Sequence, residues 1–168
     1  MLKSIFLFAA LSLAFGFAGC KKDAEQTTLH VRLTDGPGDY QQVNLDIREI
    51  RVKTSDDQNN WLLVPTTAGI YNLLDLQNGI DTLIASGPVP AVTLKEVRFV
   101  LGPDNSIMVD SILYPLQTPS AEDSGLKVKI DKNLPLDPYT IVLDIDAALS
   151  IHQQGNGAYQ LKPVIKLK

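Results

Sequence analysis

Residues 29–52 read LHVRLTDGPGDYQQVNLDIREIRV, and this stretch decides the fold. Residues 29–34 alternate apolar and polar side chains, and residues 43–47 do the same, which is the period-two pattern of strands with one buried face. Between them, residues 35–39 consist only of Asp, Gly and Pro, which favour turns and interrupt both helices and strands. The stretch therefore predicts two strands joined by a loop.

The second alternation contains a phase change. Ile50 and Val52 are out of phase by one residue with the apolar positions that end at Ile47. A β-bulge near Arg48 and Glu49 would return both residues to the buried face, because a bulge inserts one extra residue into the strand.

Further strands follow along the chain, each bounded by Gly, Pro, Asp or Asn. They are expected at Trp61–Val64, Tyr71–Leu76, Thr93–Leu101, Ser106–Tyr114, Gly125–Ile130, Thr140–Ile145 and Tyr159–Leu167. One short helix is expected at residues 78–85, where Ile80, Leu83 and Ile84 are spaced for one helical face and Gly87 ends the segment.

These elements predict an all-β fold, an antiparallel β-sandwich of about seven to eight strands with one short helix. A parallel α/β sheet is excluded because it would need helices between the strands. Within the strand at 140–145, Ile141, Leu143 and Ile145 should face inward together, because residues two apart share a face.

The amino end predicts export. Residues 1–3 form a short positive start, residues 5–18 an uncharged apolar run, and Ala18-Gly19-Cys20 resembles a lipobox. The run is too short for a spanning helix of about 20 residues. We therefore expect residues 1–19 to be a lipoprotein signal peptide, with Cys20 lipidated by palmitate-type chains.

Residues 20–28 are expected to form a polar tether, and residues 29–168 a single β-sandwich domain. Cys20 is the sole cysteine, so it has no disulfide partner, and the alternative to lipidation is a buried or free thiol. The tether fits an outer-membrane lipoprotein and leaves open whether the domain faces the periplasm or the surface.

The overall charge is acidic. The chain has 15 Lys and Arg against 19 Asp and Glu, a net charge of −4, with no long run of one sign. Nucleic acid is therefore not expected as a partner. The expected partners are the membrane, through the lipid, and a glycan or an envelope protein.

Several separated motifs resemble a family, the domain-of-unknown-function family 4382 of bacterial lipoproteins. The motifs occupy residues 33–40, 43–52, 75–79, 143–148, 155–157 and 161–165, and the resemblance spans roughly residues 29–167. It implies an exported β domain and no reaction. Ile145 keeps an apolar residue where members have Phe, whereas Leu149 stands where members have Arg.

Catalytic signatures are scarce. The chain has two histidines, His30 on the polar face of the first strand and His152 near a Gly-rich turn. It has no Gly-x-Ser-x-Gly elbow, His-Glu-x-x-His pair or phosphate-binding loop. We expect no enzyme and no cofactor; the alternative is an envelope hydrolase using His152 or His30 with carboxylates.

Metal binding is a second hypothesis, because aspartates supply the oxygen ligands that calcium prefers. The weak candidates are Asp35, Asp39, Asp46, Asp144 and Asp146. For Asp35 and Asp39, bonds to local backbone amides are the favoured interpretation. For Asp146, capping the helical turn that begins at Ala147 is favoured, and Asp144 is left undecided.

Ligand binding through aromatic rings is the third hypothesis, since amphipathic rings suit sugar recognition as well as they suit cores. The weak candidates are Trp61, Tyr40 and Tyr159, with Tyr71, Tyr114 and Tyr139 as further rings. The expected function is therefore a membrane-anchored binding or structural module of the cell envelope.

Overall fold

A computed structural model describes residues 25–57, 59–119 and 125–168, so the expected signal peptide and Cys20 lie outside the described residues. The first strands are β1 (Gln26–Thr34), β2 (Gln42–Lys53), β3 (Trp61–Val64), β4 (Gly69–Asn72), β5 (Thr82–Pro90), β6 (Thr93–Leu101) and β7 (Ser106–Val109). The remaining strands are β8 (Ile112–Gln117), β9 (Leu126–Asn133), β10 (Tyr139–Ile145), β11 (Ile151–Gln153), β12 (Tyr159–Leu161) and β13 (Ile165–Leu167). Two short helical elements complete the described part, the 3-10 helix η1 (Leu73–Leu76) and the α-helix α2 (Ala147–Ser150).

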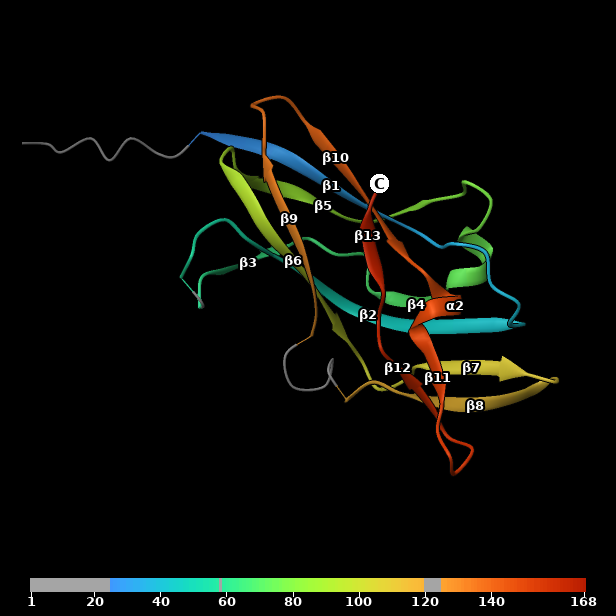
Figure 1. The fold of residues 1–168 in the computed structure, drawn as a ribbon. Helices are drawn as coiled ribbons and strands as arrows, with labels where there is room; N and C mark the ends of the chain where they lie inside the picture. The colour runs from blue at the N-terminus through green and yellow to red at the C-terminus, as the bar shows by residue number, and fades with distance from the viewer. Residues whose placement is uncertain (1–24, 58, 120–124) are drawn as a thin grey trace, which may run out of the picture.

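The strands form two sheets, which confirms the predicted all-β sandwich. The smaller sheet has the order β13-β10-β1-β5, and the larger runs β11-β12-β8-β7-β2-β6-β9, with β3 and β4 also paired to β2 (Figure 1). Near the edges, Thr66 bridges to Ala85 of β5, and β13 contacts β9. These contacts cover edges that would otherwise present unpaired backbone groups. No helix in the described segments is long and apolar enough to cross a bilayer.

The core lies between the inner faces of the two sheets. Alternate residues of β1 and β10 are buried there, and Ile141, Leu143 and Ile145 all point inward as expected. Phe99 of β6 is among the largest fully buried side chains. The predicted bulge is confirmed: the pairing of β2 with β6 shifts register between Ile47 and Glu49, which leaves Ile50 buried.

The prediction of antiparallel sheets holds for most strand pairs but not for all of them. β1 pairs with β10 in parallel along six residue pairs, and β12 pairs with β8 in parallel. A parallel partner must return from a distant part of the chain, and β10 begins 105 residues after β1 ends, so local patterning did not reveal the pairing.

The helix predicted at residues 78–85 is wrong. Residues 82–90 form strand β5, in which Ile84 is buried while Leu83 is 41% exposed, as alternation across a sheet requires. Short apolar runs have no unique period, and β5 tolerates Pro88 and Pro90 because it ends the smaller sheet's order.

Three predicted strands were each divided. The segment 106–114 is the β7–β8 hairpin, turning at Asp110 and Ser111, whose positive φ angles of 50° and 63° suit a tight turn. Residues 71–76 become the end of β4 and then η1, which Asn72 caps. Residues 159–167 become β12 and β13 in different sheets. The division raises the strand number above the seven or eight expected.

Candidate functional site

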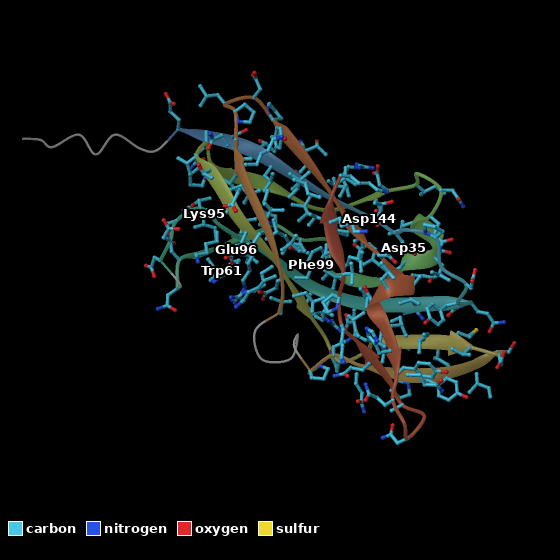
Figure 2. All side chains as sticks on the ribbon, viewed as in Figure 1. Asp35, Trp61, Lys95, Glu96, Phe99 and Asp144 are labelled. Atoms are coloured by element: carbon cyan, nitrogen blue, oxygen red, sulfur yellow. The ribbon has the colours of Figure 1, made fainter. Side chains whose placement is uncertain are left out.

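A cationic surface surrounds Trp61 on the outer face of the larger sheet, and we call it the Trp61 face. Residues directly opposite one another on neighbouring strands point to the same side of a sheet. The register places Lys53 opposite Trp61 and Glu96, and Glu96 opposite Lys129. The next row on that side joins Leu63, Arg51, Arg98 and Lys127. Strands β3, β2, β6 and β9 thus form one surface on which five of the eight residues in these two rows are basic, with Lys53 itself only 4% exposed. Figure 2 shows Trp61, Glu96 and Lys95 gathered there.

Arg98 is stacked on the indole at the centre of this face. Its guanidinium carbon lies 3.8 Å from the centroid of the Trp61 ring, and the Lys53 ammonium lies 5.9 Å from the ring. Both distances are within cation–π range. Because the Arg98 guanidinium lies over the indole, Trp61 orients this cation in addition to contributing apolar surface.

The stem of Arg98 is held from below by Gly125. A Cβ at Gly125 would lie 2.8 Å from Arg98 Cγ and 2.6 Å from the Phe99 carbonyl oxygen, so a side chain there would occupy the space of the arginine. Burial lowers the pKa of Arg98, and repulsion from Arg51 lowers it further. Arginine nevertheless stays charged at neutral pH, because the guanidinium group is not deprotonated in proteins.

The cations of the Trp61 face exceed their carboxylate partners. Arg51 pairs with Glu49, and the neighbouring Lys95 pairs with Asp56. In the described part of the chain, no carboxylate lies within ion-pair distance of Arg98, Lys53, Lys127 or Lys129. The Arg98 Nε is buried and has no hydrogen-bond partner among the described residues. On a chain of net charge −4, this surplus makes a local site for an anionic group.

The two tyrosines predicted with Trp61 lie elsewhere. Tyr159 is only 8% exposed, and its ring is 5.3 Å from that of Tyr114. Burial raises the pKa of Tyr40, and the nearby Tyr159 raises it further. Tyr40 precedes the first residue of β2, whereas Trp61 pairs with the last, so the whole strand separates them. Tyr159 is buried in the core and Tyr40 is half-buried against it, which favours a packing role for both.

Three of the predicted metal-ligand candidates, Asp35, Asp144 and Asp146, do lie near one another. Figure 2 shows Asp35 and Asp144 close together and well apart from Trp61. Gly36 lies against two of them: its Cβ would be 3.6 Å from Asp146 Cγ and 3.9 Å from Asp144 Oδ1. Asp144 forms an ion pair of 3.1 Å with Lys168, and Asp146 lies 4.0 Å from Lys166. Across the described segments, no group of three or more His, Cys, Asp or Glu side chains is arranged to hold a metal ion.

Asp35, the third of these carboxylates, does not bond locally, so that prediction is wrong. Its carboxylate accepts hydrogen bonds from the Ala147 backbone N–H at 2.9 Å and from the Gln77 side chain at 3.2 Å. Burial raises the pKa of Asp35, the two hydrogen bonds lower it, and repulsion from Asp144 and Asp146 adds to the increase. Asp35 therefore joins the first loop to the start of α2.

The two remaining metal-ligand candidates lie apart from this group. Asp39 is exposed near Tyr40, and the buried Asp46 accepts a hydrogen bond from Arg48.

The cap predicted at Asp146 is confirmed. Asp146 is the N-cap of α2, and its Oδ1 accepts the Leu149 backbone N–H at 3.0 Å. Asp146→Ala should lose about 1 kcal/mol of unfolding free energy, whereas Asp146→Asn should stay within about 0.5 kcal/mol of wild type, because Asn caps nearly as well. Urea denaturation measures both. If millimolar calcium raises the wild-type melting temperature and Asp146→Asn abolishes the rise, the carboxylate holds a metal and the capping role is not the main one.

The two histidines lie in different sheets. His30 of β1 has its Nδ1 2.9 Å from the Ser86 hydroxyl of β5, and His152 is exposed on β11. No carboxylate among the described residues hydrogen-bonds to either ring.

A shallow groove of about 450 Å³ lies on the larger sheet and contains neither histidine. It is lined by Ile70, Pro103, Asp104, Asn105, Ser106, Leu113, Tyr114 and Pro115.

Sequence reasoning missed Arg98, Arg51 and Lys53. The sequence does contain one pattern that points to this face, namely pairs of cations two residues apart on the polar sides of strands. These pairs are residues 51 and 53, and residues 127 and 129. That signal places each pair on one side of its own strand, but it does not show that the strands are neighbours.

Comparison with known proteins gives one match. A family described as a domain of unknown function, DUF4382, matches residues 26–163. No curated protein and no solved structure matches the chain.

Proposed function

We propose that this chain, which belongs to the DUF4382 family, is a lipid-anchored module of the cell envelope that binds an anionic glycan on its Trp61 face. The observation that carries the proposal is the guanidinium of Arg98, held 3.8 Å over the Trp61 ring, with no carboxylate of the described residues within ion-pair distance. A stacked arginine is already oriented, so little side-chain entropy is lost when it binds an anion.

The shape of the face supports a polymer over a small molecule. Small ligands take concave pockets that bury most of their surface, whereas this site lies on the outer side of four paired strands. Rows of cations across adjacent strands can hold successive charged groups of an extended chain. Among extended polyanions, acidic polysaccharides suit an envelope protein of net negative charge better than nucleic acid does.

A binding measurement on residues 21–168 tests this proposal. Polygalacturonate should bind and neutral dextran should not, and Arg98→Gln should weaken polygalacturonate binding about tenfold or more, because a hydrogen bond to a charged group contributes about 1.5–3 kcal/mol. Affinity should also fall with added salt.

Arg32→Gln is the matched control for that measurement. Arg32 lies on β1, in the other sheet, where it pairs with Asp81, so its loss should leave polysaccharide binding unchanged. Equal binding by wild type and Arg98→Gln would contradict the role of the Trp61 face. Absence of binding to any acidic or neutral glycan would contradict glycan recognition as a whole.

The anchor is supported by the apolar run and the small residues before Cys20. Cys20→Ala should abolish labelling by radioactive palmitate and leave the chain uncleaved by the lipoprotein peptidase or released by another. Two or three acyl chains anchor a protein stably, because each buried methylene contributes about 0.8 kcal/mol. Equal label in wild type and variant would contradict lipidation at this residue.

A second candidate function is hydrolysis, which the contact between Ser86 and His30 favours. A serine hydroxyl bonded to an imidazole forms part of a nucleophilic triad. The third member, a carboxylate on the other ring nitrogen, has no counterpart among the described contacts of His30. Binding is therefore the better-supported proposal.

A further inference from the structure

Three segments are tied together where the chain enters the domain. The Ala91 N–H donates to the Glu25 carbonyl at 2.8 Å, and the Leu134 N–H donates to the Val92 carbonyl at 3.1 Å. The Thr27 hydroxyl donates to the Asp137 carbonyl at 2.6 Å. The β5–β6 turn and the β9–β10 loop therefore flank the start of β1, and the β7–β8 hairpin lies at the opposite end (Figure 1).

Each flanking segment exposes a large apolar side chain. Val92 in the β5–β6 turn is 44% exposed, and Leu136 in the β9–β10 loop is 59% exposed. The β9–β10 loop also contains Pro135 and Pro138, and β5 ends at Pro90, immediately before the β5–β6 turn. Because proline has no N–H, such loops contain fewer backbone donors that would lose water on entering a lipid interface. Val92 and Leu136 are therefore apolar tips on segments with fewer backbone donors to desolvate.

The length of the tether limits which part of the domain can reach the membrane. Cys20 lies six residues before Gln26, the first residue of β1, and six residues span at most about 20 Å. A domain of this size has a diameter of about 35–40 Å. A lipid on Cys20 would therefore hold this end, and not the β7–β8 hairpin, close to the bilayer.

Charges of both signs surround this end. Asp131 and Lys132 of β9, Asp137 of the β9–β10 loop and Glu25 before β1 are all exposed, and the tether adds Lys21, Lys22 and Asp23 in sequence. Cations and carboxylates nearly balance. Contact with lipid at this end would accordingly depend on the apolar tips and would not require anionic headgroups.

We propose that the two tips, Val92 and Leu136, insert into the headgroup layer of the membrane that holds the lipid anchor, and so fix the orientation of the domain on the bilayer. This inference rests on the anchor proposed above. Interfacial binding of this kind scales with the buried apolar area. The occupant of this surface is a lipid bilayer, not a protein.

The experiment uses the full-length lipoprotein, reconstituted in vesicles of equal parts phosphatidylethanolamine and phosphatidylglycerol. Val92→Cys, Leu136→Cys and Leu113→Cys are each labelled with the environment-sensitive fluorophore NBD; an acylated Cys20 has no free thiol, so the label is unique. Leu113 is the matched control, because it is 56% exposed and lies on the β7–β8 hairpin. Melting temperatures confirm that each variant is folded.

The expected result is a blue-shifted, brighter emission at positions 92 and 136 and a water-like emission at 113. The shift should persist at high salt and in vesicles of phosphatidylcholine alone, because apolar contact is not screened. Anionic headgroups bound by the Trp61 face would instead give a signal that salt removes, and this result would overturn the inference.

Other outcomes separate this inference from the anchor. If the protein floats with vesicles while all three labels stay water-like, the anchor stands and the docking of the tips is wrong. Equal shifts at all three positions indicate unspecific adsorption and also overturn it. If wild type fails to float and matches Cys20→Ala, both the anchor and the inference fail.

Discussion

Ile145→Asp should destabilise the domain by at least about 4 kcal/mol, a large share of the roughly 5–15 kcal/mol that holds a typical domain folded. Ile145 is fully buried on β10, between the inward-facing Leu143 and the start of α2. An aspartate there loses the apolar contacts and places a carboxylate in the core without a designed partner. Urea denaturation, followed by the fluorescence of Trp61, the single tryptophan of the chain, measures the change.

The control for this substitution is Ile112→Asp. Ile112 is 54% exposed at the start of β8, so the same chemical change should cost less than about 0.5 kcal/mol there. A midpoint for Ile145→Asp that matches the control would mean that the inner face of β10 is not where the core lies.

Gly125→Ala should have the second-largest effect, a loss of about 2–4 kcal/mol. Gly125 has a φ of +70°, which disfavours alanine, and its Cβ would lie 2.6 Å from the Phe99 carbonyl oxygen. The backbone of β6 cannot move away without disturbing its pairing with β9, so overpacking adds to the strain. Because the same Cβ meets Arg98, polygalacturonate binding should weaken as well.

Gly157→Ala separates the two causes of that loss. Gly157 has a φ of +84°, but no atom lies within 4 Å of the Cβ position. It should therefore show the conformational strain alone, about 1 kcal/mol. If the two alanine variants unfold at the same urea concentration, the close packing beneath Arg98 contributes nothing to stability.

Patterns within one strand or one turn predicted much of the fold. The strand at Thr93–Leu101 agrees with β6 at both ends, and the bulge after Ile47 was expected from a single break in alternation. The capping role of Asp146 was likewise readable, because an N-cap side chain bonds to a backbone N–H only two or three residues further along the chain. Where the local signal was ambiguous, as at residues 82–85, the prediction failed.

The candidate site was predicted only in part. Trp61 was identified from its ring, but its stacked partner Arg98 was not, because β3 and β6 contribute to the same face only through their separate pairing to β2. Asp35 shows the same limit, since its hydrogen-bond partner Ala147 lies 112 residues away.

By itself, the sequence determined the β character of the domain and the residues of β1, β2 and β10 that face its core, and it carries the pattern from which export and lipidation at Cys20 are expected. These features depend on side chains that are neighbours along the chain, where period and spacing are sufficient. Only the tertiary structure decided which strands pair, that β1 lies parallel to β10, and that cations from β2, β6 and β9 surround Trp61. Such contacts join segments that are far apart in sequence, and the distance between two segments along the chain does not show whether they become neighbours in the folded domain.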